Sequence, residues 1–236
     1  MADGALALTA ALVELFSAGL PRWQEHRGRD RQRFVNAVAS RLAEHHLQVA
    51  RWSEESHLPT ALMSLPTRAP TIGLQLRSIP RRFGGYEGEH RDESDLLLDS
   101  GDFAVLGDPG AGKTTTLRRL AGLVALEAPR DVLDSFRYVV LVVCRERDLK
   151  QGLYPVLGDI TGVVGAVAEL VDDPELEIRR ILGQGALILV DGLDEVRAAD
   201  RARIEVELVQ LARGLTSSKL IVSCRSGRIP RALGRS

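Results

Sequence analysis

A glycine-rich segment near the middle of the chain combines residue types that bind phosphate. Residues 107–114 read GDPGAGKT and follow the apolar run at 103–106. Glycines let the backbone turn tightly and aim successive N–H groups at one point, where a following helix adds the positive end of its dipole. The natural ligand of such a loop is a polyphosphate. We expect the residues in contact with it to be Gly107, Asp108, Pro109, Gly110, Ala111, Gly112, Lys113, Thr114 and Thr115.

Two side chains of this segment have defined roles in the pattern G-x-x-x-x-G-K-[ST], which the segment matches. We expect Lys113 to reach the β- and γ-phosphates of a nucleotide, and the Thr114 hydroxyl to coordinate Mg²⁺, a hard cation that prefers oxygen. The alternative is a glycine-rich turn that only begins a helix. The segment lies between an expected strand and an expected helix, and this context favours nucleotide binding.

Three carboxylates form a second group of candidate residues. Asp191 ends the apolar run at 186–190, and Asp194 and Glu195 follow it closely. Ligands of open α/β sheets bind at the C-terminal ends of the strands, so we expect Asp191 to meet the magnesium ion. Either Glu195 or Asp194 could orient or deprotonate a water for attack on the γ-phosphate. Capping of the next helix is the alternative role, although it makes costly use of three neighbouring charges.

Arg225 is a third candidate, because it directly follows the apolar run at 219–224. An arginine at the C-terminal end of a strand could stabilise the charge of a γ-phosphate or sense its loss. The alternative is a surface arginine without a role. The position of its strand relative to the loop strand decides between the two.

The elements that must position these residues alternate between strand and helix. Apolar runs with almost no polar alternation predict strands that are buried on both faces, as in a parallel sheet covered by helices. We therefore predict an α/β fold of the P-loop NTPase type, with three layers and a small helical region ahead of it. The predicted strands are 102–106, 137–144, 186–191 and 219–224, and the predicted helices are 113–126, 162–171, 174–183 and 199–214.

Composition divides the chain into three parts. Helical spacing of apolar residues predicts helices at 5–18 and 29–51, within a helical N-terminal region at 1–58. Prolines and glycines interrupt the periodicity at 59–98, which we interpret as a partly ordered linker with one candidate strand, TIGLQL, at 71–76. The nucleotide-binding core is expected at 99–236.

The charge balance and the apolar runs restrict the classes of partner. Lys and Arg number 31 against 32 Asp and Glu, so no overall field recruits nucleic acid or an anionic membrane. The N-terminal apolar stretch contains Asp3 and Glu14 with no preceding basic residue, which argues against a signal peptide. Cys144 and Cys224 each end an apolar run and suit packed, reduced thiols. We expect a cytoplasmic protein with neither a membrane partner nor a specific nucleic-acid partner.

Three stretches, GDPGAGKTTTLRRLA, ALILVDGLDEV and KLIVSCRSG, resemble the NACHT branch of the STAND signal-transduction NTPases. The acidic stretch carries most of the resemblance, which covers about residues 70–230. The resemblance implies that the Walker A loop at 107–114 and the Walker B residue Asp191 hold ATP with Mg²⁺. It also implies that Asp194 and Glu195 form the extended acidic pair and that Arg225 is the sensor arginine.

Members of this family use ATP binding and slow hydrolysis to switch between a closed monomer and an open oligomer, in innate immunity or defence against phage. Their chains usually continue past the sensor strand, so we expect a truncated chain, weak ATPase activity at most, and self-association or completion by another chain. The family's sheet order would leave the strand at 102–106 without one neighbour. Two other functions stay open: a small-molecule kinase with Arg145 and Arg147 as lid residues, and a structural remnant that no longer hydrolyses nucleotide.

Overall fold

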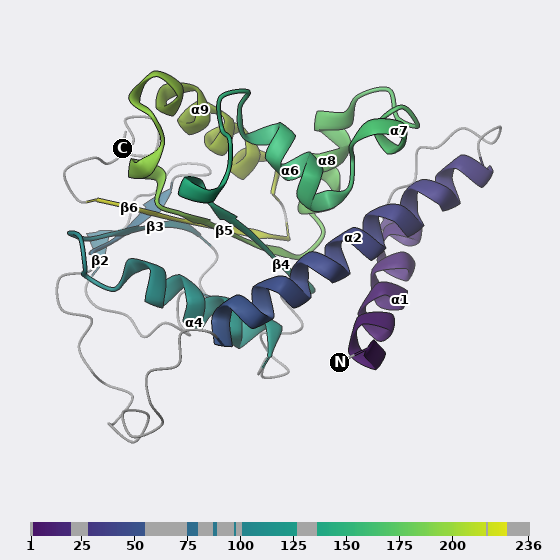
Figure 1. Ribbon diagram of the computed structural model, residues 1–236, viewed down its shortest axis with the longest axis horizontal. Coiled ribbons are helices and arrows are strands. Elements are labelled where there is room, and N and C mark those ends of the chain that lie inside the picture. The colour runs from purple at the N-terminus through teal and green to yellow at the C-terminus, as the bar shows by residue number, and fades with distance from the viewer. Residues whose placement is uncertain are drawn as a thin grey trace.

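A six-stranded sheet forms the centre of the described structure (Figure 1). The computed structural model describes residues 2–19, 28–54, 75–79, 87–88, 97, 101–126, 136–215 and 217–225. In space the strands follow the order β2-β1-β3-β6-β5-β4, and the last four run parallel to one another. The strands are β1 (Gln75–Ile79), β2 (Glu87–Gly88), β3 (Asp102–Leu106), β4 (Tyr138–Val143), β5 (Ala186–Asp191) and β6 (Lys219–Cys224). The four strands predicted from apolar runs are confirmed.

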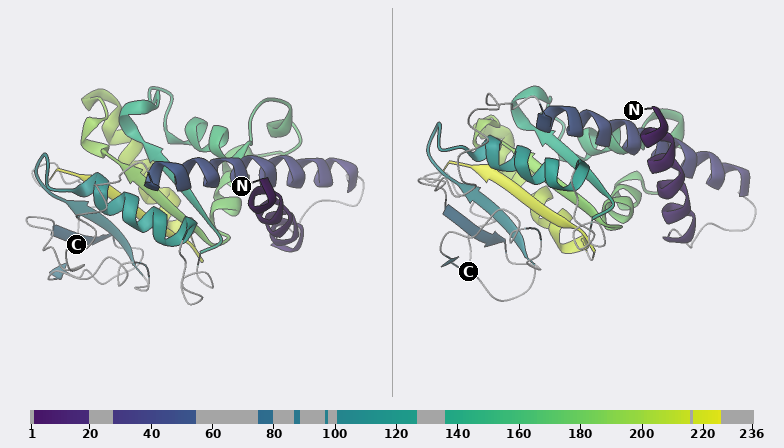
Figure 2. Two further views of the ribbon diagram at one scale, coloured as in Figure 1. Left: turned by 60° about the horizontal axis from the view of Figure 1, so that its bottom comes forward. Right: turned by 90° about the horizontal axis from the view of Figure 1, so that it is seen from below.

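Alternate residues of the parallel strands face two separate apolar clusters. In β4, Val140 and Val142 belong to one cluster, and Val139 and Leu141 belong to the other. Helix α4 (Lys113–Ala125) covers the second cluster, whereas α6 (Leu153–Thr161), α8 (Pro174–Leu182) and α9 (Ala198–Gly214) cover the first. Figure 2 shows α4 on one side of the sheet and the other three helices on the opposite side. The predicted three-layer α/β fold is confirmed.

The N-terminal helices pack on this sheet. They are α1 (Ala2–Gly19) and α2 (Gly28–Glu54), close to the predicted ranges 5–18 and 29–51. Phe16 of α1 is fully buried and contacts Tyr138 of β4 edge to face, with ring centroids 6.2 Å apart. Helix α2 lies along β4, the last strand of the sheet (Figure 1). Both helices therefore share an apolar core with the sheet, while the proposed boundaries at 58 and 98 stay predictions.

Two histidines of α2 cover the outer edge of β4. His45 Nε2 accepts a hydrogen bond from the Leu141 N–H at 3.0 Å, and His46 Nδ1 accepts one from the Val139 N–H at 3.2 Å. Burial lowers the pKa of His45 to about 4 and also lowers the pKa of His46. Both rings are therefore neutral at neutral pH, as acceptance requires. The bonds satisfy edge donors that would otherwise offer a template to another strand.

The strand that precedes the glycine-rich loop has a neighbour on each side, so the expectation that it would lack one was wrong. Strand β1 pairs antiparallel with β3, from Gln75 opposite Leu106 to Ile79 opposite Asp102. Strand β2 then pairs with β1. The physical reason is that a segment upstream of the loop supplies the backbone partners that this edge needs. Of the strand expected at 71–76, residues 71–74 lie outside the described residues.

One stretch of helix prediction needs correction. The pattern at 162–171 predicted one helix, but the structure has α6, which ends at Thr161, and then α7 (Gly165–Ala168), a single turn. Gly162 ends α6 with φ of 79°, a left-handed conformation that a side chain would strain. A Cβ there would also lie 2.9 Å from the Cβ of Arg41 on α2. The glycine therefore ends the helix and allows α2 to approach.

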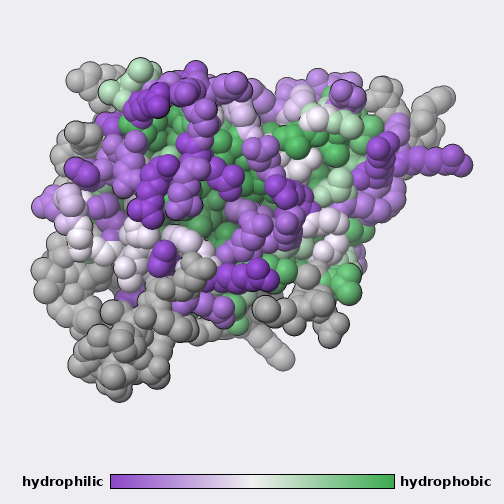
Figure 3. All heavy atoms as spheres, in the orientation of Figure 1, coloured by the Kyte–Doolittle hydropathy of each residue, from purple (hydrophilic) through white to green (hydrophobic). Residues whose placement is uncertain are grey.

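The surface over the first apolar cluster is mixed. On the face that Figure 3 shows, hydrophobic residues are visible among hydrophilic ones above α6 and α8. Val164 and Leu176 in this part of the chain are exposed. Among the described residues, no helix combines the length and apolarity that crossing a lipid bilayer requires.

Candidate nucleotide-binding site

The glycine-rich loop connects β3 to α4 and has the backbone conformation that its glycines allow. Gly110 and Gly112 have φ of 81° and 92°, values that residues with a side chain rarely adopt. A Cβ at either position would meet no heavy atom within 4 Å, so it is backbone geometry rather than space that calls for glycine. The Ala111 N–H donates to the Asp108 carbonyl at 3.1 Å and closes a turn. The loop therefore leads directly into the N-terminus of α4.

The Lys113 side chain folds back over this loop. Its ammonium group donates hydrogen bonds to the carbonyl oxygens of Gly107 at 2.7 Å and Asp108 at 3.0 Å. Both acceptors are neutral, so a phosphate oxygen offers the ammonium a stronger, charged partner. The lysine is already at the loop where its predicted role requires it.

Asp191 ends β5 at the same edge of the sheet. It is 6% exposed, and its Oδ2 accepts a hydrogen bond from the Thr114 hydroxyl at 2.9 Å. Its Oδ1 accepts a second hydrogen bond, at 2.6 Å, from the Ser223 hydroxyl of β6. The predicted metal ligands Thr114 and Asp191 therefore lie together.

The oxygen donors of this pair suit Mg²⁺. A magnesium ion commonly takes one or two protein oxygens and completes its shell with phosphate oxygens and waters. No group of three or more His, Cys, Asp and Glu side chains that could hold a metal occurs in the part of the chain that the structure describes. The residues present therefore fit a metal that is bound together with a polyphosphate, not one held by a protein cage.

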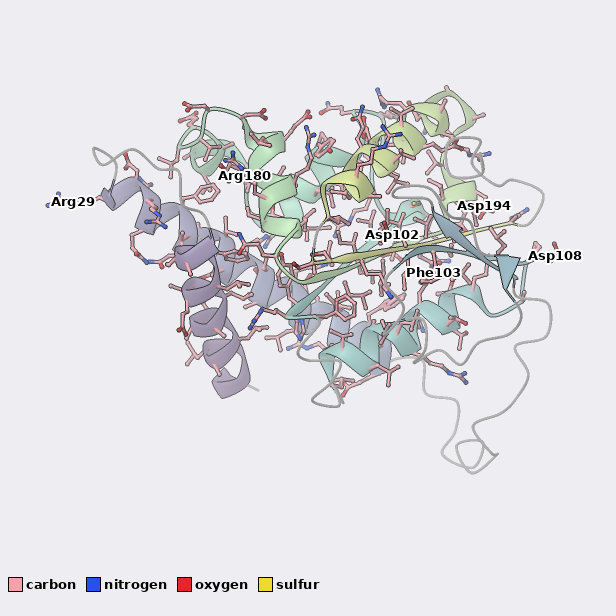
Figure 4. The ribbon with its side chains drawn as sticks, turned by 180° about the vertical axis from the view of Figure 1, so that it is seen from behind. Arg29, Asp102, Phe103, Asp108, Arg180 and Asp194 are labelled. Atoms are coloured by element: carbon pink, nitrogen blue, oxygen red, sulfur yellow. The ribbon has the colours of Figure 1, made fainter. Side chains whose placement is uncertain are left out.

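Arg225 also lies beside the loop, because its strand, β6, is next to the loop strand, β3. This is the position that a role at the γ-phosphate requires. Strand β6 pairs with β3, and the Gly107 N–H donates to the Cys224 carbonyl at 3.3 Å. The Arg225 side chain, which is 47% exposed, forms an ion pair with Asp194, with Nε 2.7 Å from Oδ2. Figure 4 shows Asp108 and Asp194 toward the same end of the sheet. The structure thus brings the third candidate to the first two.

The two candidate catalytic carboxylates differ in their surroundings. Both belong to the 3-10 turn η4 (Leu193–Glu195). The Asp194 side chain is only 5% exposed and is paired with Arg225, whereas Glu195 is exposed. The Glu195 carboxyl carbon would lie 3.1 Å from a Cβ at Gly192, so this carboxylate folds back toward the end of β5.

Sequence reasoning missed two residues that hold the site together. Ser223 binds Asp191. Finding it would have required the strand register, in which Val190 lies beside Val222 and Val105 lies beside Ser223. Arg201 of α9 donates to the carbonyl of Asp194 at 2.7 Å and thereby anchors η4. Spacing along the sequence gives no signal for such contacts between elements.

The arginines considered for a kinase lid lie away from the loop. Arg145 is exposed and pairs with Glu146 at 3.6 Å. Arg147 lines a cavity of about 180 Å³ beside His45, at the outer edge of β4. Strand β4 is separated from β3 by β5 and β6, which corresponds to roughly 14 Å at about 4.8 Å per strand. Both arginines nevertheless follow the C-terminal end of β4, at the same edge of the sheet as Asp191, so their role in a kinase lid stays a prediction.

The two cysteines are free and buried, as predicted for packed thiols. Burial, the largest cause, together with nearby carboxylates that include Asp194, raises the pKa of both Cys144 and Cys224 to about 12. Both side chains are therefore neutral thiols at neutral pH, and neither is a nucleophile for the site.

A comparison with protein families adds to this geometry. The family model described as "NACHT domain" matches residues 103–236. The chain is also similar to parts of curated ATP-binding proteins. It is 39% identical over 63 residues to the spermidine/putrescine import ATP-binding protein PotA of Nitrosospira multiformis, which is 26% of this chain and 17% of that protein.

Two further relatives give the same picture. The aliphatic sulfonates import ATP-binding protein SsuB 2 of Pseudomonas aeruginosa is 51% identical over 53 residues, which is 22% of this chain and 19% of that protein. The ribose import ATP-binding protein RbsA 1 of Mesorhizobium japonicum is 31% identical over 105 residues, or 44% and 18%. The matches thus span less than about a fifth of the length of these curated relatives.

Proposed function

Because the chain belongs to the NACHT domain family, and is therefore a P-loop NTPase module that binds nucleotide, we propose that it acts as a switch controlled by Mg²⁺-ATP. In this proposal, ATP and ADP favour different conformations or assemblies of the chain. The processes that the switch would serve are signalling in innate immunity or antiviral defence, in the cytoplasm. The nucleotide is the small-molecule partner, and the protein partner is a second copy or another chain.

The positions of the loop and strand residues support the binding part of the proposal. The backbone of residues 107–115 and the Lys113 ammonium would bind the phosphates, and Thr114 and Asp191, which already lie together, would hold the magnesium ion. Bound Mg²⁺ would neutralise phosphate charge and orient the phosphate chain. The lysine would exchange the carbonyls of Gly107 and Asp108 for phosphate oxygens, which offer charged hydrogen bonds.

We assign the water-orienting role to Glu195. Its carboxylate is exposed and lies against Gly192, next to the end of β5. Asp194, the other candidate, is paired with Arg225 and its side chain is only 5% exposed, so a water reaches it less readily than it reaches Glu195. Hydrolysis in this proposal is weak, and it serves to end the ATP-bound state.

The Arg225–Asp194 ion pair is the observation that carries the switch. Arg225 lies beside the phosphate loop, half-exposed, and is paired with the Asp194 carboxylate at 2.7 Å. A γ-phosphate offers it a partner of higher charge, whereas a diphosphate leaves the pair intact. Loss of the pair would free Asp194 in η4, which α9 holds through Arg201. In this way the γ-phosphate would alter the contacts among Arg225, η4 and α9.

Nucleotide affinity and molecular mass test this proposal together. We expect ATP and ADP, each with Mg²⁺, to bind with different affinities and to give different masses or conformations of the wild-type chain. The variant Arg225→Ala should bind nucleotide but respond alike to ATP and ADP. The switch would be contradicted if ATP and ADP bound with equal affinity and if the mass and shape of the chain were the same with ATP, with ADP and without nucleotide. Native mass spectrometry and small-angle scattering supply these readouts.

A proposal on domain organisation follows from the same arrangement. We keep the division into a helical region at 1–58, a linker at 59–98 and an NTPase core at 99–236. In this proposal the first region is docked on the core through α2, which contacts both β4 and α4. Because α4 carries Lys113 and Thr114 at its start, nucleotide binding would be transmitted to the N-terminal helices.

A further inference from the structure

We propose that Ser223 is a positioning residue for the magnesium-binding carboxylate of Asp191. This inference rests on the proposed function, because it concerns the metal that accompanies the nucleotide. Ser223 does not itself meet the metal or the phosphates in this proposal. It acts by fixing the orientation of the one carboxylate that does.

The Ser223 hydroxyl donates one hydrogen bond and accepts another. It donates to Asp191 Oδ1 at 2.6 Å and accepts a hydrogen bond from the Gly192 N–H at 2.8 Å. The side chain is fully buried, at 0% exposed, so water does not compete for either bond. The hydroxyl is therefore held in one orientation, and it connects Asp191 to the backbone of the residue that follows it.

The sheet gives this contact a rigid base. In the parallel register Val190 lies beside Val222, which places the next pair, Asp191 and Ser223, side by side. Strand β6 is flanked by β5 and β3, so Ser223 lies on an interior strand whose position is fixed on both sides. The Ser223–Asp191 bond lies wholly between β5 and β6, and it does not depend on what the glycine-rich loop holds.

The two oxygens of Asp191 are consequently divided between two neighbours. Oδ1 is bound to Ser223 in the sheet, and Oδ2 faces the Thr114 hydroxyl at the start of α4. A carboxylate held at one oxygen cannot rotate freely, so the other oxygen stays directed toward the metal ligand Thr114. Partners of this kind, one step removed from a metal, commonly change metal affinity by about 10- to 100-fold when they are removed.

The chain offers a matched control in Ser218, five residues earlier in the same stretch. Its hydroxyl is also buried and accepts two hydrogen bonds of 2.9 Å, from the N–H groups of Gly185 and Ala186. These contacts lie at the opposite end of β5 from Asp191. The variants Ser223→Ala and Ser218→Ala therefore both remove a buried hydroxyl between the same two strands, but only the first removes it from the metal-binding carboxylate.

The test titrates MgCl₂ into each chain with a fluorescent ATP analogue at a temperature where all variants are folded. We expect Ser223→Ala to weaken the apparent magnesium affinity by about tenfold or more, while affinity for the analogue in EDTA stays unchanged. Ser218→Ala should lower the melting temperature without changing the magnesium dependence. Unchanged magnesium affinity in Ser223→Ala, or an equal loss in Ser218→Ala, would overturn the inference.

A double-mutant cycle separates positioning from general destabilisation. On an Asp191→Asn background, Ser223→Ala should have no further effect on magnesium affinity, because the residue through which it acts has lost its charge. Additive losses would overturn the inference. A wild-type chain that binds the analogue without any magnesium dependence would instead contradict the proposed function itself, so the two failures can be told apart.

Discussion

The two ends of the parallel strands both contain buried polar side chains, but these side chains have different partners. At the N-terminal end, Asp102 accepts a hydrogen bond from the Leu220 N–H at 2.8 Å. Ser218, at the same end, accepts from the N–H groups of Gly185 and Ala186. These contacts join a side chain to backbone, so they contribute to the pairing and placement of the strands.

At the C-terminal end, carboxylates bind to side chains of other elements. Asp191 accepts from Thr114 of α4 and from Ser223 of β6. Asp194 is paired with Arg225, which follows β6. A bond between two side chains can be exchanged for a bond to a ligand without loss of backbone structure. Polar groups at the N-terminal end thus hold the sheet together. At the C-terminal end, Thr114 and Arg225 can exchange a carboxylate partner for a ligand, while Ser223 keeps Asp191 in place.

Removal of the Lys113 ammonium is expected to have the largest effect. Lys113→Ala should weaken Mg²⁺-ATP binding by roughly a thousandfold, because the lysine is expected to contact two phosphates and a charged hydrogen bond contributes about 1.5–3 kcal/mol. Thermal unfolding with and without Mg²⁺-ATP measures the loss, since ligand binding to the native state raises its stability. Lys150→Ala, at an exposed lysine near Asp148, is the control. Full stabilisation of Lys113→Ala by Mg²⁺-ATP would contradict the site.

His45 and His46 on the outer edge of β4 also bind backbone N–H groups, like the polar side chains at the N-terminal strand ends. The pH dependence of stability tests this structural role. Burial, and secondarily the charges of Arg147, Arg41 and His46, lowers the pKa of His45 from 6.5 to about 4. Between these values the unfolded chain binds the proton and the folded chain does not. The contribution of His45 to stability is therefore complete above pH 6.5 and falls by up to about 3 kcal/mol as the pH decreases to about 4.

Urea unfolding at several pH values measures this dependence. A His45→Gln variant keeps an acceptor for the Leu141 N–H but no longer titrates. Its stability should therefore depend less on pH in this window than that of the wild type. Equal pH dependence of the two chains would show that His45 is not buried as an acceptor.

A pair of aspartate variants tests the comparison between the strand ends directly. Asp102→Ala should lower the free energy of unfolding by about 2 kcal/mol, because the buried Leu220 N–H loses its acceptor, and should leave magnesium-dependent binding unchanged. Asp191→Asn should weaken magnesium-dependent binding and leave the free energy of unfolding nearly unchanged. Denaturant unfolding and magnesium titration, applied to both variants, provide the readouts. If both variants lose both properties, the two ends do not have separate roles.

The smallest predicted effect concerns the choice between ATP and ADP. Arg225→Ala should weaken ATP binding by about tenfold and leave ADP binding unchanged, since one charged hydrogen bond is lost only with the triphosphate. Asp194→Asn should strengthen ATP binding relative to ADP, because Arg225 no longer has to leave a carboxylate. Calorimetric titration with each nucleotide measures both ratios. A parallel loss of ATP and ADP affinity in Arg225→Ala would place this arginine outside the γ-phosphate site.

The sequence allowed the parallel strands and the main site residues to be predicted, because both depend on local patterns. An apolar run such as 186–190 that ends in Asp191 defines a buried strand and a carboxylate at its C-terminal end. The spacing of glycines, Lys113 and Thr114 likewise defines a loop before a helix. These features require no knowledge of which strands are neighbours.

Helix α6 (Leu153–Thr161) was missed although it is a local element, but the other missed features depend on contacts between distant segments. The pairing of β1 with β3 joins segments more than twenty residues apart, and nothing in the periodicity of 59–98 indicates it. Ser223 becomes informative only when the register of β5 and β6 is known. The roles of His45 and Gly162 likewise depend on where α2 packs. Local sequence patterns therefore predict helices and strands. The contacts of residues such as Ser223 and His45 depend on how those helices and strands pack together.

Calorimetric titration of the wild-type chain with ATP, in MgCl₂ and in EDTA, tests the central claim most directly. We predict one nucleotide bound per chain, with markedly higher affinity in the presence of magnesium. Absence of binding at millimolar Mg²⁺-ATP to a folded chain would contradict the proposal that the ends of β3, β5 and β6 form a magnesium-nucleotide site.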